Sequence, residues 1–282
     1  MSIIDHERSW GTAFIFPFSS AHFLVILVVV CALLLAVTPQ AAAQTSDTVA
    51  LVLVQQATSA LGAGSGVSDL VLSGSATRKD ASGTVSGAIV LKATAQHQSR
   101  TDFNVTTGVL TQVRDSSTRI PSGHFVDSSG VVHALALHNC WTDVGWFSPV
   151  ISELLTTSDS TLVFRYSGQE TMRGVAVNHS VVKRRLTDEP PQAAVFVAQL
   201  STTDFYLDAK TSLPVAMRFN QHPDSSASTN LLVTVNFSQY QQLSTGQMVP
   251  FRITRYESSV VTDIQLTNVV VNSGVTASVF AN

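Results

Sequence analysis

The sequence predicts a mainly β protein with few helices, built on an antiparallel sheet. From Leu70 onward, apolar and polar residues alternate in short runs that are rich in Val, Ile, Thr and Phe. Clusters of Gly, Ser and Asp separate these runs, which is the pattern of strands joined by tight turns. Charged residues make up only 12% of the 282-residue chain, so Ser and Thr supply much of its polar surface.

An apolar segment near the start of the chain indicates export. Residues 23–37 carry no charged side chain and no strongly polar one, and small residues follow at Ala41 and Ala43. A secretory signal has an apolar core of about 7–15 residues before an A-x-A cleavage site, whereas a membrane-spanning helix needs about 20. We therefore predict a signal peptide over residues 1–43, cut after Ala43.

The charge of this leader leaves a second interpretation open. Asp5 and Glu7 outweigh Arg8 in a region that is usually positive. An uncleaved membrane anchor is therefore the alternative to cleavage. In both cases residues 44–282 are expected to form a single β-rich domain outside the cytoplasm, either periplasmic or secreted.

Charge and cysteine content exclude some classes of function. The chain has 16 Lys and Arg against 19 Asp and Glu, a formal net charge of −3. It therefore lacks the basic surface with which proteins bind nucleic acid. Cys31 lies in the leader, so Cys140 is the one cysteine left after cleavage. We expect no disulfide, and stability from burial and sheet hydrogen bonds.

The first element after the leader is predicted to be a helix over residues 48–61. Asp47 precedes it as an N-cap, and the apolar residues Leu51, Val54 and Leu61 recur at helical spacing. The glycine-rich residues 62–66 end it. They precede a strand and no Lys-Ser/Thr pair follows them, so they are not a phosphate-binding loop.

The strands are expected in two groups. The first comprises residues 70–77, 84–94, 100–106 and 110–114, followed within 123–140 by one hairpin around 127–130. The second comprises residues 162–169, 175–183, 205–208, 215–219, 231–240, 249–256 and 260–271. Residues 186–192 and 221–229 are predicted to be exposed loops.

A second helix is predicted over residues 141–155, where apolar residues recur at i, i+3 and i+4 and Asp143 can cap the start. It either packs on the sheet as ordinary core or covers the mouth of an apolar cavity. The residues predicted to line that cavity or to form its lid are Trp141, Trp146, Phe147, Ile151 and Leu154.

The sequence gives no local catalytic or metal-binding motif. The sequence contains no Gly-x-Ser-x-Gly turn, the motif that exposes a nucleophilic serine. His133, His138 and Cys140 lie close together, with Asp143 nearby, but they lack the full set of spaced ligands that a metal needs. Because apolar residues flank Cys140, we expect a buried thiol and not a nucleophile. We predict no enzyme activity, no metal and no cofactor.

The second half of the chain resembles the LolA/LolB-like lipoprotein-carrier superfamily. Residues 205–215 are similar to its hairpin with an Asp turn and a Leu-Pro pair. Residues 237–253 are similar to the next hairpin, and residues 263–272 to the last long strand. Upstream, residues 87–92 and 100–103 look like its second and third strands. The segment 123–155 has no counterpart in the resemblance.

This resemblance implies a fold and a function. The fold is a strongly curved antiparallel sheet forming an open half-barrel, with an N-terminal helix and a helix near the concave face. Proteins of this kind carry acylated ligands or sense envelope lipids through the apolar cavity.

We therefore expect an exported, non-enzymatic protein of the cell envelope that binds a hydrophobic ligand, either a lipid or a lipoprotein acyl chain. The expected partner is that ligand or an acylated protein, with transient contact to a membrane, and the chain is expected to be a monomer. The alternatives are a structural or protein-interaction β module whose core is filled, and a hydrolase with a scattered site.

Overall fold

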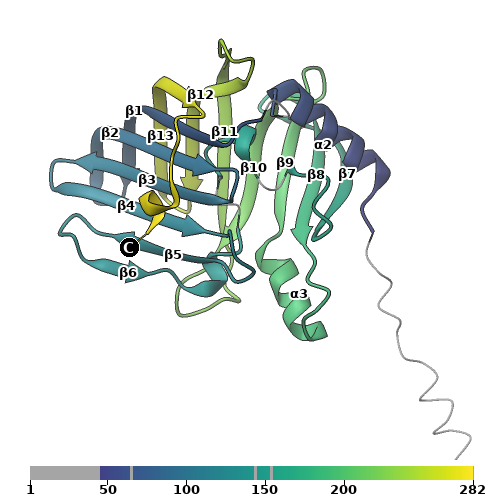
Figure 1. The fold of residues 1–282 in the computed structure, drawn as a ribbon, viewed down its shortest axis with the longest axis horizontal. Coiled ribbons are helices and arrows are strands. Elements are labelled where there is room, and N and C mark those ends of the chain that lie inside the picture. The colour runs from purple at the N-terminus through teal and green to yellow at the C-terminus, as the bar shows by residue number, and fades with distance from the viewer. Residues whose placement is uncertain (1–44, 64–65, 143–144, 153–154, 282) are drawn as a thin grey trace, which may run out of the picture. The chain divides into compact units, whose positions relative to one another are not determined.

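The structure is a computed structural model, and it describes residues 45–63, 66–142, 145–152 and 155–281 (Figure 1). The predicted leader over residues 1–43 lies outside the described residues, and so does Asp143. All statements below refer to the described part of the chain.

Helix α2 (Thr48–Leu61) forms where the sequence predicts it. Asp47 is its N-cap, with a side-chain oxygen that accepts a hydrogen bond from the Val49 N–H at 2.8 Å. Gly62 ends the helix in the left-handed conformation, at φ +65°, which glycine adopts without steric cost. One face of the helix is buried, at positions spaced by three and four residues: Ala50, Val54, Ala57 and Leu61.

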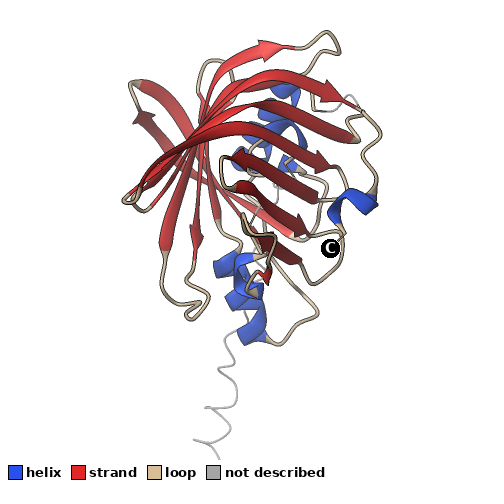
Figure 2. Cartoon of the chain, turned by 90° about the vertical axis from the view of Figure 1, so that its left-hand side faces the viewer, coloured by secondary structure: helices blue, strands red, loops and turns tan. Residues whose placement is uncertain are grey.

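The strands form one 13-stranded antiparallel sheet. Its order is β6-β5-β4-β3-β2-β1-β13-β12-β11-β10-β9-β8-β7, so each pair of neighbours in the sheet is consecutive in the chain except β1 with β13. The sheet is curved and does not close, which makes it an open half-barrel (Figure 2). The strands are β1 (Asp69–Asp80), β2 (Gly83–Thr94), β3 (Gln98–Val105), β4 (Gly108–Asp115), β5 (Ser122–Val126), β6 (Val132–Ala134), β7 (Leu162–Met172), β8 (Val175–Arg184), β9 (Thr203–Asp208), β10 (Pro214–Gln221), β11 (Leu231–Gln242), β12 (Met248–Glu257) and β13 (Val260–Val271).

The predicted fold class and the predicted strands are therefore confirmed. The alternation of apolar and polar residues is a local signal, and it places one side of every long strand against the core. That side, the inner face, includes Leu72 of β1, Leu91 of β2, Phe205 of β9 and Ile253 of β12, all almost fully buried.

Two predictions about helices are wrong. None of the described residues between 141 and 155 is in an α-helix: they form turns and irregular backbone, the 3₁₀ turn η2 (Pro149–Ile151) and a further 3₁₀ residue, Leu155. Pro149 lacks an N–H, and the residue before it, Ser148, is extended at φ −141° and ψ 102°, so the α-helix cannot run through this point.

Conversely, α3 (Pro191–Leu200) begins inside the segment predicted to be a loop. Pro191 occupies its first turn, where no hydrogen bond is lost, but no side-chain N-cap precedes it to signal a helix. Short 3₁₀ turns also occur at η1 (Leu137–Asn139) and η4 (Ala277–Phe280). No helix in the described part of the chain is long and apolar enough to cross a membrane.

The two ends of the domain are joined by the β1–β13 pairing, visible in Figure 1 as the purple strand beside the yellow one. A buried carboxylate, Asp69, fastens this junction. It accepts hydrogen bonds from the Ser273 N–H at 2.8 Å, the Ser273 hydroxyl at 2.6 Å and the Gly274 N–H at 3.1 Å. Asn272 adds a second link, because its Oδ1 accepts from the Ser68 N–H at 2.7 Å.

A bulge between Ser73 and Gly74 bends the same pair of strands. A β-carbon at Gly74 would lie 2.1 Å from the Gln265 carbonyl oxygen, so only glycine allows the backbones to approach this closely. The bulge therefore contributes to the bend of the half-barrel at the junction.

Asp69→Asn should destabilise the domain in a pH-dependent way. Burial would by itself raise the pKa of Asp69, but the hydrogen bonds from Ser273, Gly274 and Ser68 outweigh it and lower the pKa. The ionised carboxylate therefore stabilises the fold above the unfolded pKa of about 4, and this contribution is lost as the pH falls through the lower native value. We expect a loss of about 1–3 kcal/mol in the free energy of unfolding at pH 7.

Urea denaturation at several pH values measures this effect. The difference between the two proteins should shrink as the solution is acidified, because protonated Asp69 then resembles asparagine. The exposed Asp188 provides the control, and Asp188→Asn should change the stability little at any pH. An Asp69→Asn variant as stable as the natural chain at pH 7 would contradict the role of the carboxylate.

Candidate functional site

The apolar inner face of the sheet is covered by α2 and by the described part of the loop between η1 and β7. We call this loop part the cover segment (residues 145–152 and 155–158). Its apolar side chains are buried in the same core cluster as the inner face and the buried face of α2. They are Trp146, Phe147, Val150, Ile151 and Leu155.

The structure brings together three of the five predicted site residues. Phe147 is fully buried, and Trp146 and Ile151 are 6% and 9% exposed. Trp141 lies in a different place, in a pocket beside α3. Leu154 lies outside the described residues.

The backbone hydrogen bonds within the cover segment each span three residues. They run from Ser148 to Gly145 at 2.9 Å, from Ile151 to Ser148 and from Ser152 to Pro149 at 3.3 Å, and from Leu155 to Ser152 at 3.2 Å. Such 3₁₀ bonds have poorer geometry than those of an α-helix. One side-chain bond joins the segment to α2: the Thr58 hydroxyl lies 3.3 Å from the Leu155 carbonyl oxygen, and it also donates to the Val54 carbonyl at 2.9 Å.

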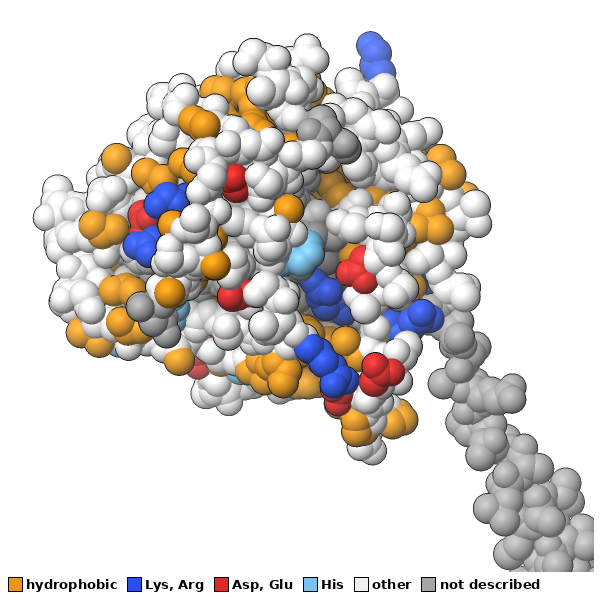
Figure 3. Space-filling view, viewed as in Figure 1, with side chains coloured by type: hydrophobic (Ala, Val, Ile, Leu, Met, Phe, Trp, Pro, Cys, Tyr) orange, Lys and Arg blue, Asp and Glu red, His pale blue; other side chains and the backbone are white. Residues whose placement is uncertain are grey.

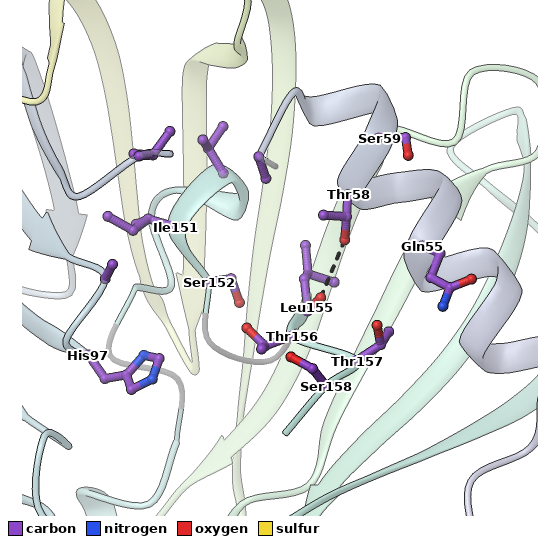
Figure 4. Close-up of a pocket in the computed structure, with 14 residues that line it drawn as sticks. Gln55, Thr58, Ser59, His97, Ile151, Ser152, Leu155, Thr156, Thr157 and Ser158 are labelled. Carbon is purple, nitrogen blue, oxygen red and sulfur yellow. Dashed lines mark hydrogen bonds between the residues drawn. The ribbon is translucent and has the colours of Figure 1, made fainter. Parts of the chain in front are cut away.

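Between α2 and the cover segment lies a pocket of about 420 Å³, which we call the α2 pocket (Figure 4). Figure 4 shows Thr58 pointing across it to Leu155, with Ile151 on the opposite wall. The turn between β2 and β3 closes a further side with His97. The lining is mixed: apolar side chains come from the cover segment, Ala63 and Val67, and hydroxyls and an amide come from Gln55, Ser59, Ser152, Thr156, Thr157 and Ser158.

The space left over the first half of the sheet is much smaller. A cavity of about 160 Å³ lies between Trp146 and strands β1 to β5, β12 and β13. A cavity of about 150 Å³ accommodates one benzene molecule. The cover segment therefore fills most of the inner face here, and a longer ligand would have to displace Trp146.

This small cavity has a cationic wall. The Arg255 guanidinium carbon lies 5.0 Å from the centre of the Trp146 ring, and Arg255 pairs with Glu257 at 2.9 Å. Burial lowers the pKa of Arg255, but a guanidinium keeps its charge at neutral pH. Its Nε is buried without a hydrogen-bond partner among the described residues. Arg78 lines the same cavity and lies 3.6 Å from Asp80, so each of the two guanidiniums there has a carboxylate neighbour.

Four histidines are engaged away from the α2 pocket. His133 hydrogen-bonds Asp127 at 3.0 Å, and His179 lies between Glu170 and Asp204. His138 and His222 hydrogen-bond the carbonyl oxygens of Pro223 and Thr229. None of these four imidazoles hydrogen-bonds a serine or cysteine side chain, so none of them supports the hydrolase hypothesis.

The buried thiol is inert in this fold. Cys140 is 1% exposed, and burial raises the pKa of its thiol. Its sulfur lies 3.6 Å from the Ala136 carbonyl oxygen. Among the described residues, no group of three or more His, Cys, Asp or Glu side chains is placed to hold a metal ion.

Comparison with known proteins shows similarity in structure and not in sequence. No protein-family model matches the sequence, and no curated protein matches it. A putative outer membrane lipoprotein-sorting protein domain from Vibrio parahaemolyticus superposes with a TM-score of 0.55 at 14% identity, covering 82% of this chain and 95% of that one.

Two further solved structures are similar. A DUF1329 family protein from Desulfovibrio piger gives a TM-score of 0.54 at 11% identity, over 82% of this chain and 97% of that one. A LolA superfamily protein from Nitrosomonas europaea gives 0.51 at 11% identity, over 83% and 97%. The chain has the LolA/LolB-like fold.

The LolA-like fold agrees with the resemblance seen in the sequence, except in one segment. The N-terminal helix and the open half-barrel are present as expected. In place of the second helix near the concave face, this chain has the cover segment, which contains the 3₁₀ turn η2.

Sequence reasoning missed the polar half of the α2 pocket. Gln55, Thr58 and Ser59 lie at i, i+3 and i+4 on one side of α2, so helical spacing could have grouped them. The serines and threonines at 156–158 carry no such signal, because only the tertiary fold brings them opposite α2.

Trp146→Ala should cost about 3–5 kcal/mol in the free energy of unfolding, because it empties a buried aromatic site. Trp146 contacts the Phe147 ring edge-on at 5.5 Å between centroids, and it is stacked with Arg255. Urea denaturation measures the loss. Trp141→Ala is the matched control, and its partly exposed side chain should cost clearly less. Equal losses would show that Trp146 is not an anchor of the cover segment.

Proposed function

We propose that this chain is an exported, non-enzymatic protein of the cell envelope that binds a hydrophobic ligand, a lipid or a lipoprotein acyl chain. The observation that carries the proposal is the α2 pocket, which lies between α2 and the cover segment, a cover that is not an α-helix. Small-molecule sites are typically apolar clefts of about 300–1,000 Å³ with a few polar groups. The α2 pocket has this size, and its apolar wall is joined by a larger share of hydroxyl groups.

The binding mechanism follows from burial. On the scale of one benzene in about 150 Å³, a pocket of 420 Å³ has room for an alkyl chain of roughly 16 carbons. Each CH₂ that leaves water for the pocket contributes about 0.8 kcal/mol. Ile151 and Leu155 supply apolar wall, while the hydroxyls near the opening suit a polar head group.

The role of the other predicted residues follows from their positions. Trp146 and Phe147 act as a plug over the small cavity, and their displacement would extend the site along the inner face. Arg255, with its unpaired Nε, is then placed to meet an anionic head group. The similar structure from Vibrio parahaemolyticus is a putative outer membrane lipoprotein-sorting protein domain, which supports the same class of ligand.

Export and oligomeric state are part of the proposal. Residues 1–43 serve as the signal peptide, and residues 44–282 work as a monomer in the periplasm or outside the cell. Contact with a membrane is transient, at the moment when the ligand is taken up or released.

A filled interaction module is the second candidate. It is favoured by one observation, the complete burial of Phe147, which shows that the chain's own side chains occupy much of the inner face. A partner protein would then add a strand at an open sheet edge, β6 or β7.

Gln55→Trp should separate these candidates. Gln55 is exposed on α2 and lines the α2 pocket, so an indole there fills the pocket without removing a core residue. We expect binding of a fluorescent fatty acid to weaken by about tenfold or more. Gln56→Trp is the matched control: Gln56 is exposed on the same helix, does not line the pocket, and should leave the affinity unchanged.

The titration is paired with extraction of the purified protein into organic solvent and mass spectrometry. Co-purified lipid and saturable binding support the ligand-binding function. Absence of both would favour the filled module, and equal affinities of the Gln55→Trp and Gln56→Trp proteins would move the ligand away from the α2 pocket.

The leader is tested by N-terminal sequencing of the exported product from a chain tagged at its C-terminus. Cleavage after Ala43 gives a product that begins at Gln44. A product that retains residues 1–43 and fractionates with membranes would instead establish the anchor.

A further inference from the structure

A second apolar pocket lies beside α3, away from the α2 pocket. Its walls come from α3, η1 and Trp141, and from residues 119–120 and 186–189, with no strand among them. We call it the α3 pocket, and its volume is about 360 Å³. The larger apolar side chains that line it are Ile120, Leu137, Trp141, Leu186, Phe196 and Leu200.

The mouth of this pocket exposes large apolar side chains. Ile120 is 64% exposed, Leu137 52% and Phe196 43%. In Figure 3 apolar side chains gather beside charged ones at the lower edge of the molecule, over α3 in the view of Figure 1. Singly exposed apolar residues are ordinary on a protein surface, but a group of them around a pocket marks a binding site.

Arg119 places a positive charge at the mouth of the α3 pocket and has hydrogen-bond donors that are not used. The Arg119 side chain is 60% exposed, and its Nη2 donates to Glu189. Its Nε and Nη1 make no hydrogen bond in the described part of the chain. The ion pair with Glu189 is exposed and therefore weak, so an oxyanion can share or replace it at little cost.

We propose that the α3 pocket binds the single alkyl chain of an anionic amphiphile, with the head group at Arg119. On the same volume scale, 360 Å³ has room for roughly 14 carbons, which matches one chain and excludes a two-chain lipid lying wholly inside. The site is independent of the α2 pocket, so it stands whether or not the function proposed above is correct.

The test uses Trp141 as a reporter, because it lines the α3 pocket while Trp146 lies on the inner face. The exported protein with Trp146→Phe is titrated with 12-bromododecanoate below its micelle concentration. We expect saturable quenching of Trp141. Ala193→Phe, which fills the pocket, should raise the concentration for half-quenching by about tenfold or more. Val195→Phe, on the same helix but outside the lining, should leave it unchanged.

The head group is tested by Arg119→Gln. Dodecanoate should bind about two- to fivefold more weakly, the range expected for one exposed ion pair, while binding of dodecanol stays the same. Equal losses for both ligands would remove the anionic head group from the proposal.

Calorimetry on the chain with all its tryptophans provides a second measurement if the Trp146→Phe protein does not fold. Ala193→Phe should then remove one dodecanoate binding event that Val195→Phe keeps. Unquenched Trp141 at saturating ligand, or identical behaviour of the two phenylalanine variants, would overturn the site. Binding to phosphatidylglycerol vesicles without binding of monomeric dodecanoate would make this surface a membrane contact and also overturn it.

The two proposed sites fail in distinguishable ways. Gln55→Phe fills the α2 pocket without adding a tryptophan and should leave quenching of Trp141 unchanged. Loss of Trp141 quenching in that variant would show that the two pockets are not independent.

Discussion

The pairing of β1 with β13 is the constraint on which the rest of the fold depends. Each of the other neighbouring strand pairs in the sheet is consecutive in the chain, so the sheet would otherwise be two separate meanders, β1 to β6 and β7 to β13. Joining the first and last strands makes one sheet whose curvature encloses a single apolar inner face. The buried Asp69 carboxylate and the bulge at Gly74 lie at this junction, one fastening the strand ends and the other bending the strands. Because side chains alternate along each strand, the junction also keeps both meanders in the same in-and-out register.

Because β1 and β13 are paired, the segment that connects the two meanders is the one that crosses and covers the inner face. That connection runs from β6 through η1 to β7, and it includes the cover segment. Pro149 prevents an α-helix there, so the cover is anchored mainly by its buried side chains, together with hydrogen bonds that span three residues. Opening it would break little regular backbone structure, but it would expose the buried aromatic side chains of Trp146 and Phe147 to water.

The elements that the sequence predicts well are those whose signals are local. The cap at Asp47, the stop at Gly62 and the two-residue period of the strands each depend on neighbours in the chain, and each is found as expected. The cover segment shows the limit of this reasoning. Its apolar residues have helical spacing, but this spacing reflects their contacts with the sheet and α2. The backbone conformation is instead determined locally by Pro149, which prevents an α-helix. Helix α3 shows the opposite case, because it lacks a side-chain N-cap and packs mainly through tertiary contacts at its buried residues Val197 and Leu200.

A ligand that binds on the inner face would exchange the protein's own apolar contacts for new ones. The free energy it gains from burial therefore depends on whether space is already present. A ligand that displaces Trp146 replaces one buried aromatic surface by another, so the net gain from hydrophobic burial is small. In the α2 pocket the space of about 420 Å³ already exists, and a ligand there adds contacts without removing the core. We therefore expect the first part of an acyl chain to enter between Thr58 and Ile151. Displacement of Trp146 is then favoured only for chains that are too long to fit in the α2 pocket.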